Sequence, residues 1–168
     1  MNRRDMLKTA GLAVAGATLL GAEAFASENK KQSKCKKALV IGAHPDDPEG
    51  NVGGTMLRLR QAGWEVVSVY LTRGEGGIKG KNNDEAAAIR SQEAINACKI
   101  LDARPVFMTQ IDGNTEINKA RYAEMRELIA NENPDIVFTH WPIDGHPDHR
   151  VCSILVFDAW RRLNYNFE

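Results

Sequence analysis

Four short apolar segments, which alternate with stretches of helical spacing, constrain the fold of this chain more than any other feature. The apolar segments, rich in β-branched residues, are 38–41, 66–71, 105–108 and 136–138. The stretches with apolar residues at helical intervals are 53–62, 84–101, 116–131 and 151–162. Parallel strands need right-handed crossovers, and helices supply them. We therefore expect an α/β, Rossmann-like three-layer fold, with helices on both faces of a mostly parallel sheet.

The composition excludes several classes of protein. The 168 residues suit one domain with a genuine core. Lysine plus arginine total 22, and aspartate plus glutamate also total 22. The chain therefore lacks the excess of basic residues that is typical of proteins that bind nucleic acid. Cys35, Cys98 and Cys152 are too few and too scattered for a disulfide framework. Since Cys98 and Cys152 fall in predicted helices, we expect them to be small core residues.

The first residues have the pattern of an export signal. Two adjacent arginines resemble a twin-arginine signal, an apolar run follows at 9–22, and 24–26 has the small-x-small form of a cleavage site. The apolar run is shorter than the roughly 20 residues that span a bilayer, which favours a cleaved signal over a membrane anchor. We expect 1–26 to be a signal peptide, 27–37 a linker and 38–168 the domain of a periplasmic or extracellular protein.

Two clusters of histidine and aspartate each follow a predicted strand. All four histidines fall in them, with His44 in the first cluster and His140, His146 and His149 in the second. Either cluster alone could be a turn, because proline and aspartate favour turns. Ligands of open α/β sheets bind beyond the carboxyl ends of strands, where the strand order reverses. Because strands one and four would flank that reversal, we expect the two clusters to face each other across one crevice.

Histidine and aspartate are ligands suited to a catalytic zinc ion with one open coordination position. His44 and Asp47 are three residues apart, so a single turn can direct both inward. His146 and His149 are also three apart, and either both meet the metal or one of them faces the substrate. Four protein ligands plus water would leave little room for catalysis, which favours the second arrangement. A bound zinc ion would lower the pKa of its water towards about 7.

Several motifs resemble the LmbE-like, or PIG-L, family of zinc-dependent N-deacetylases, which has a Rossmann-like fold. The similarity extends over about 38–160. The motifs that carry it are Ala43-His44-Pro45-Asp46-Asp47-Pro48-Glu49, Gly53-Gly54-Thr55, Leu71-Thr72-Arg73-Gly74-Glu75, Arg90-Ser91-Gln92-Glu93-Ala94 and His146-Pro147-Asp148-His149. The resemblance implies that His44, Asp47 and His149 bind the zinc ion. Sites of histidine and aspartate also accept other divalent ions such as Fe²⁺.

The same resemblance implies roles for the residues around the metal. Asp46 would be the general base that takes a proton from the metal-bound water. His146 would polarise the carbonyl, stabilise the oxyanion and help protonate the leaving amine, and Asp148 would orient His146. Arg90 and Asp112 match positions that contact sugar hydroxyls in the family.

The chain departs from the family pattern in two places. Pro48 stands where the family more often has an acidic residue, although Glu49 follows it. The sequence ends at Glu168, whereas family members generally continue through further strands and loops. We therefore expect the domain to lack the C-terminal part that completes the sheet and one wall of the pocket.

The function expected from these features is metal-dependent hydrolysis of the N-acetyl, or another N-acyl, group of an amino sugar. The substrate would be a small molecule or a glycan, without nucleic acid and without a stable membrane span after cleavage. The alternative is a non-catalytic module that binds zinc or sugar, the remnant of such an enzyme. Nucleotide binding at Gly53-Gly54 lacks the spacing of a dinucleotide fingerprint, and no nucleophile elbow indicates a serine hydrolase.

Overall fold

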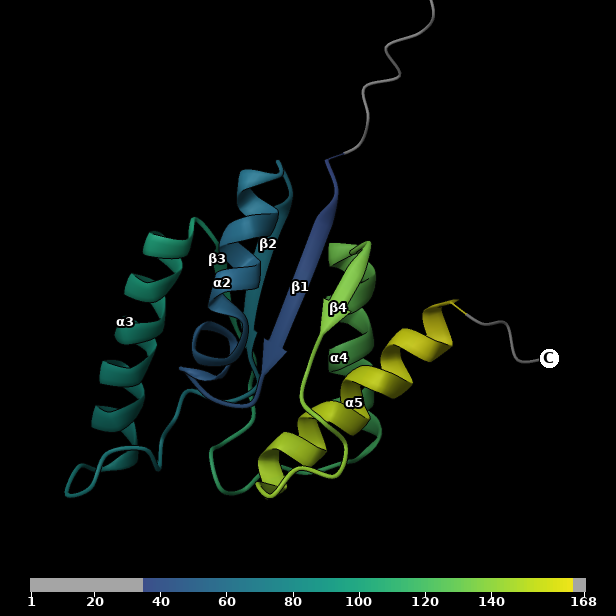
Figure 1. Ribbon diagram of the computed structural model, residues 1–168. Helices are drawn as coiled ribbons and strands as arrows, with labels where there is room; N and C mark the ends of the chain where they lie inside the picture. Colours follow the sequence, from purple (N-terminus) through teal and green to yellow (C-terminus); the bar gives the residue numbers. More distant parts are fainter. Residues whose placement is uncertain (1–34, 165–168) are drawn as a thin grey trace, which may run out of the picture. The chain divides into compact units, whose positions relative to one another are not determined.

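The computed structural model describes residues 35–164, in which strands and helices alternate strictly (Figure 1). The elements are β1 (Lys37–Gly42), α2 (Asp47–Gln61), β2 (Glu65–Tyr70), α3 (Asn83–Leu101), β3 (Arg104–Phe107), α4 (Lys119–Glu132), β4 (Ile136–Phe138) and α5 (Pro147–Asn164). The predicted signal peptide and most of the predicted linker lie outside the described residues. Within the described part of the chain, no helix combines the length and apolarity that crossing a bilayer requires.

The four strands form one parallel sheet in the order β3-β2-β1-β4. β1 pairs with β2 along its whole length, and Ala38–Val40 of β1 pairs with Ile136–Phe138 on its other side. The first and fourth strands are therefore neighbours, and the strand order reverses between them, as the sequence predicts. The α/β fold with a parallel sheet is confirmed.

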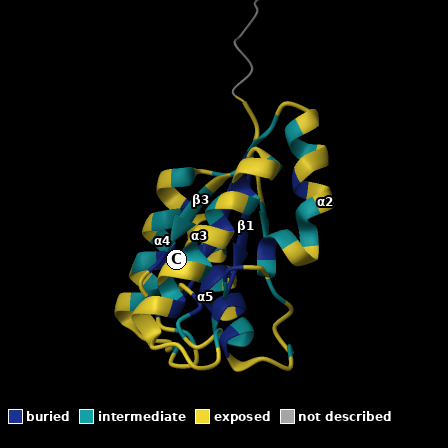
Figure 2. Cartoon of the chain, turned by 90° about the vertical axis from the view of Figure 1, so that its left-hand side faces the viewer, coloured by how far each residue is buried: buried dark blue, intermediate teal, exposed yellow. Residues whose placement is uncertain are grey.

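Helices cover both faces of the sheet because successive residues of a strand point to opposite sides. Leu39 of β1 packs in one buried cluster with Met125 of α4 and Leu155 of α5. Its neighbour Val40 packs in a second cluster with Met56 of α2, on the opposite face. β1 is consequently buried along almost its entire length (Figure 2).

The cysteines are free, and two of them belong to the core as predicted. Cys98 and Cys152 are buried, whereas Cys35 is exposed. Burial raises the pKa of the Cys152 thiol to about 12, so the thiolate is not formed at neutral pH. Cys98 lies against the hydroxyl of Tyr70, at 3.4 Å from sulfur to oxygen. Both side chains therefore act as small packing groups.

The helices that follow β1 and β4 begin earlier than the sequence analysis predicts. α2 begins at Asp47 rather than at residue 53, and α5 begins at Pro147 rather than at residue 151. Both helices have a proline in the first turn, where its fixed φ fits and its missing N–H costs no hydrogen bond. Asp47, Asp148 and His149 are therefore held by helical first turns rather than by free loops.

Candidate metal centre and active site

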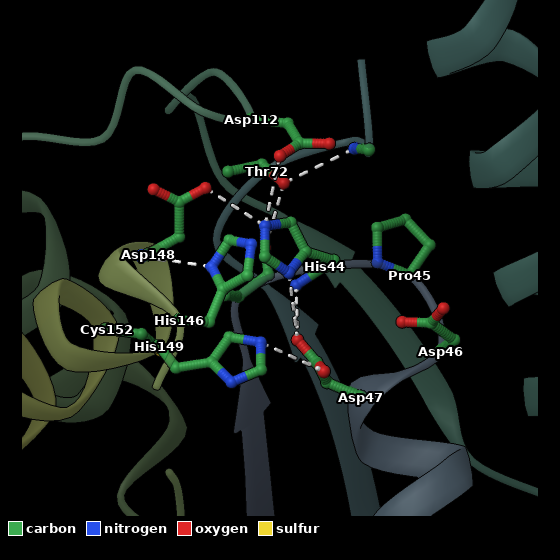
Figure 3. Close-up of polar contacts among 12 residues, drawn as sticks. His44, Pro45, Asp46, Asp47, Thr72, Asp112, His146, Asp148, His149 and Cys152 are labelled. Carbon is green, nitrogen blue, oxygen red and sulfur yellow. Dashed lines mark hydrogen bonds and ion pairs between the residues drawn. The ribbon is translucent and has the colours of Figure 1, made fainter. Parts of the chain in front are cut away.

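The two histidine and aspartate motifs meet at the carboxyl edge of the sheet (Figure 3). His44 lies in the short segment after β1, and Asp47 is the first residue of α2. His149 lies in the first turn of α5, which follows β4. Because β1 and β4 are adjacent and parallel, their carboxyl ends bring the two motifs together.

The three residues expected to bind metal lie close together, and each histidine contacts the carboxylate of Asp47. Nδ1 of His44 lies 3.3 Å from Oδ2 of Asp47, and Nε2 of His149 lies 3.4 Å from Oδ1 of Asp47. Two atoms bound to one zinc ion at 2.0–2.2 Å with tetrahedral angles lie about 3.3–3.6 Å apart. The distance from each histidine to Asp47 therefore matches the separation of two ligands of one zinc ion.

Three overlapping sets of side chains in the described part of the chain place potential ligand atoms within 4.8 Å of one another. These sets are His44, His146 and His149; Asp47, His140 and His149; and His44, Asp112 and Asp148. His140 is poorly suited to be a ligand, because its Nε2 accepts a hydrogen bond from the N–H of Ala43 at 2.9 Å. That bond occupies the lone pair which a metal ion would need.

Carboxylates surround the other nitrogen of His44. Nε2 of His44 lies 3.0 Å from Oδ2 of Asp148 and 3.1 Å from Oδ1 of Asp112. Burial tends to lower the pKa of His44, but the surrounding carboxylates outweigh it and raise the pKa from 6.5 to about 9. Because ionised carboxylates only accept hydrogen bonds, Nε2 carries a proton, and Nδ1 is the nitrogen that faces Asp47. With a pKa of about 9, the metal-free ring carries a proton on Nδ1 as well at neutral pH, and a metal ion bound there would displace that proton.

The position of Asp148 differs from the expectation that it orients His146. Its carboxylate contacts His44, accepts the N–H of Gly113 at 2.8 Å and accepts the hydroxyl of Thr115 at 2.6 Å. His146 instead receives the backbone N–H of Asp148 on its Nδ1, at 3.2 Å. The first turn of α5 explains the difference, because it directs the buried carboxylate toward the loop after β3. Burial tends to raise the pKa of Asp148, but these donors outweigh it and lower the pKa.

Asp46, the expected general base, lies at the edge of the site. Its carboxylate is 2.7 Å from a terminal nitrogen of Arg90, and Arg90 also donates to the carbonyl of Pro45. Figure 3 shows Asp46 apart from the imidazole rings, and its side chain is 64% exposed. Its φ of 111° is rare for a residue with a side chain, so the backbone is held there by its surroundings.

A hollow of about 450 Å³ connects these groups. The residues that line it are His44, Asp46, Asp47, Gly76, Gly77, Arg90, Asp112, His146 and His149. Arg90 and Asp112, the expected substrate contacts, therefore lie in the same hollow as the metal-binding side chains. A Cβ at Gly77 would fit only tightly, since it would lie 3.2 Å from the carbonyl oxygen of Gly74 and 3.3 Å from Nε of Arg90.

Sequence analysis missed several residues that hold the site. Glu75 accepts the backbone N–H of Asp112 at 3.0 Å, and Thr115 holds Asp148. Asp144 accepts the N–H of His146 at 2.8 Å, and the same oxygen lies 3.2 Å from Nδ1 of His149. Asp144 thus supports the loop that carries His146 and His149. Nothing in the sequence signals the role of Thr115.

Comparison with known proteins links this arrangement to a family. The family model for the GlcNAc-PI de-N-acetylase PIG-L matches residues 39–160. The diacetylchitobiose deacetylase of Thermococcus kodakarensis is 34% identical over 138 residues, which cover 78% of this chain and 51% of that protein.

Solved structures give the same result. The N,N′-diacetylchitobiose deacetylase of Pyrococcus horikoshii has a TM-score of 0.70 at 30% identity, covering 75% of this chain and 49% of that one. The 4-carboxy-2-hydroxymuconate hydratase GalB of Pseudomonas putida has a TM-score of 0.69 at 25% identity, covering 74% and 55%. The chain spans about half the length of these relatives. On its matched residues and its fold, the chain belongs to the PIG-L family.

Proposed function

We propose that this protein is a metal-dependent hydrolase that removes an N-acetyl, or another N-acyl, group from an amino sugar. The observation that carries the proposal is the convergence of His44, Asp47 and His149, in which each histidine lies at the spacing of zinc ligands from Asp47. The hollow beside them is also lined by Asp46, His146 and Arg90. The relatives from Thermococcus and Pyrococcus, both deacetylases of an N-acetylated disaccharide, support the same chemistry.

The ion would be held by Nδ1 of His44, a carboxylate oxygen of Asp47 and Nε2 of His149. Zn²⁺ suits this donor set, and Fe²⁺ is an alternative. When bound, the ion supplies Lewis acidity and lowers the pKa of water, so that hydroxide forms near neutral pH. The Nε2–H of His44 donates to Asp148, a second contact typical of metal-binding imidazoles.

The remaining side chains would move protons and hold the substrate. Asp46 accepts the proton of the attacking water, and Arg90 holds that carboxylate at the rim of the hollow. Because Nδ1 of His146 accepts a backbone N–H, the neutral ring carries its proton on Nε2. That proton is available to the developing oxyanion and then to the leaving amine. Arg90 and Asp112 would contact the hydroxyls of the sugar.

Release of acetate tests the proposal directly. The zinc-loaded protein should release acetate from N-acetylglucosamine or N,N′-diacetylchitobiose, and chelation should abolish the release. Asp46→Asn should lower kcat by about 10²–10⁴-fold, as expected for loss of a general base, with zinc content unchanged. His149→Ala should lose the metal itself. Asp84→Asn, an exposed acid at the start of α3, is the matched control and should leave kcat unchanged.

The rival is a module that binds zinc or an amino sugar without turnover. It would be supported if the zinc-loaded protein bound these sugars but released no acid, or if Asp46→Asn behaved as wild type.

We also propose that residues 1–26 direct export. Replacement of Arg3 and Arg4 by lysine should retain the protein in the cytoplasm if the twin-arginine route is used, which cell fractionation measures.

A further inference from the structure

A hollow between α4 and α5 is lined mainly by basic side chains. It has a volume of about 330 Å³ and shares no lining residue with the hollow of the proposed active site. The residues that line it are Lys119, Tyr122, Arg126, Asp158 and Arg162. Three cations and one carboxylate give this lining a net charge of +2 at neutral pH, although the whole chain has a net charge of zero. Positive charge is therefore concentrated in this hollow.

The packing of α4 against α5 brings these side chains together. Lys119, Tyr122 and Arg126 share one face of α4, because each follows the previous one by about one helical turn. Asp158 and Arg162 are likewise one turn apart on α5. Burial and the carboxylate of Asp158 raise the pKa of the Tyr122 hydroxyl, whereas the charge of Arg162 lowers it. The two helices are therefore within electrostatic reach of each other at this hollow.

The three cations of the hollow have no acidic partner among the described residues. The ion pairs of residues 35–164 involve other lysines and arginines, and none of them includes Lys119, Arg126 or Arg162. Arg121 of the same helix, in contrast, pairs with two glutamates. Nε of Arg126 donates to the carbonyl of Tyr122 at 3.2 Å, which fixes the side chain without neutralising it. Repulsion among like charges costs stability unless an anion offsets it.

A phosphate group complements this lining in charge and in hydrogen bonding. A phosphate monoester carries about −1.5 to −2 charges at pH 7, which balances the net charge of the hollow. The planar guanidinium group of arginine binds phosphate through two parallel N–H bonds, and lysine binds it as a point charge. A volume of about 330 Å³ admits a small phosphorylated molecule as well as a bare phosphate ion.

We propose that this hollow is a binding site for a phosphate group, carried either by a small soluble molecule or by a lipid headgroup. Arg126 and Arg162 would bind the phosphate oxygens from α4 and α5, and Lys119 would add a third positive charge. Asp158 limits the affinity, because its carboxylate repels the anion. The inference is independent of the proposed deacetylase function, since no proposed metal ligand or hydrolytic group lines this hollow.

Isothermal titration of the zinc-loaded protein with inorganic phosphate at low ionic strength tests the site. Lys119→Gln and Arg162→Gln should each weaken phosphate binding about tenfold, because each removes a charged donor. Asp158→Asn should strengthen it, and added sodium chloride should weaken it by screening. Lys99→Gln, which removes an exposed cation from the last turn of α3, is the matched control and should leave phosphate binding unchanged.

Thermal unfolding separates loss of the site from loss of the fold. Without phosphate, Lys119→Gln and Arg162→Gln should be at least as stable as the wild type, because each removes one of three repelling charges. Phosphate should raise the Tm of the wild type, and it should raise the Tm of the double variant much less.

Two further probes distinguish the sources of the phosphate group. A soluble ligand is indicated if glycerol phosphate binds and both substitutions weaken its binding. A lipid headgroup is indicated if the protein sediments with phosphatidylcholine vesicles only when they contain phosphatidic acid, and both substitutions abolish this. The site is refuted if phosphate does not bind, or if it binds equally well to Lys119→Gln and Arg162→Gln. It is also refuted if chelation of the zinc removes phosphate binding, since the metal would then be the site.

Discussion

The carboxylate of Asp148 lies 3.0 Å from Nε2 of His44, although the two residues are 104 positions apart in the chain. The first motif thus supplies the imidazole, and the second supplies the carboxylate that orients it. Hydrogen bonds of this kind fix the ring of a metal-binding histidine and increase its basicity. The two motifs therefore depend on each other, in addition to sharing a proposed ion.

Replacement of this carboxylate should weaken metal binding more than it weakens the fold. We expect Asp148→Asn to lower zinc affinity about 10–100-fold, the usual effect of losing such a partner. Competition with a chromogenic chelator measures the affinity. Thr115→Val removes only the hydroxyl that holds Oδ1 of Asp148, so its effect should be smaller. Unchanged zinc affinity in Asp148→Asn would show that the contact does not serve the metal.

Gly42 permits the close approach of β1 to the start of α2. A Cβ at Gly42 would lie 2.6 Å from Cβ of Asp47 and 2.7 Å from Cδ of Pro48. Gly42→Ala should therefore lower the free energy of unfolding by about 1–3 kcal/mol and weaken zinc binding, because Asp47 must shift. Gly50→Ala is the matched control in α2, where the added methyl meets nothing within 4 Å. It should raise the free energy of unfolding by up to about 1 kcal/mol, measured by urea denaturation.

A partly buried hydrogen bond anchors the first turn of α2 to the sheet. The hydroxyl of Tyr70 donates to Oε2 of Glu49 at 3.0 Å, and burial raises the pKa of this glutamate. Tyr70→Phe keeps the ring, which stacks on Phe107, but leaves the carboxyl group of Glu49 without this donor. We expect a loss of about 1–3 kcal/mol in the free energy of unfolding.

A double-mutant cycle isolates this contact. If the hydroxyl and the carboxyl group interact, the double mutant Tyr70→Phe with Glu49→Gln should lose less free energy of unfolding than the two single mutants lose in sum. Strict additivity would argue that the two groups do not interact.

Stability at low pH should depend on Glu132, the last residue of α4, which bridges Lys37 and Arg104 at the starts of β1 and β3. Oε2 of Glu132 lies 2.9 Å from the lysine nitrogen and 2.6 Å from the guanidinium group. Burial tends to raise the pKa of Glu132, but the two cations outweigh it and hold the pKa below 4.5. Because the folded-state pKa is depressed, the carboxylate stabilises the fold above pH 4.5, and this contribution disappears as pH falls through the folded-state pKa.

Glu132→Gln should accordingly destabilise the protein at pH 7 and approach wild-type stability at pH 3. Urea denaturation at the two pH values measures this convergence. Glu127→Gln, at an exposed position of the same helix, should show no such convergence. If the free energy of unfolding of Glu132→Gln differed from that of the wild type by the same amount at both pH values, the assigned ion pairs would be contradicted.

The fold could be predicted because the apolar runs and the helical spacing are local properties of the sequence. The segment 136–138 is the strand that the sequence predicts, and the reversal between β1 and β4 follows from parallel topology. That reversal brings His44 and His149 to one edge of the sheet. The first residues of the helices could be predicted less accurately, because the residues before the first apolar position of α2 show no helical periodicity.

The partners of individual side chains could not be predicted. The family resemblance implies that Asp148 orients His146. The first turn of α5 instead directs its carboxylate toward His44, Gly113 and Thr115. The contact of Arg90 with Asp46 depends on how α3 packs beside the loop after β1, which no local pattern encodes. Such partners are set by tertiary packing.

The short ladder between β1 and β4 has a consequence for how the protein matures. β1 and β4 are the first and last strands in the described part of the chain, and proposed metal ligands follow each of them. During synthesis, His44 and Asp47 cannot meet His149 until β4 has paired with β1 and the start of α5 has packed beside them. The proposed metal site would then form only after β4 has paired with β1, and a bound ion would stabilise that pairing by mass action. Uptake of the ion would thus follow the docking of these two strands.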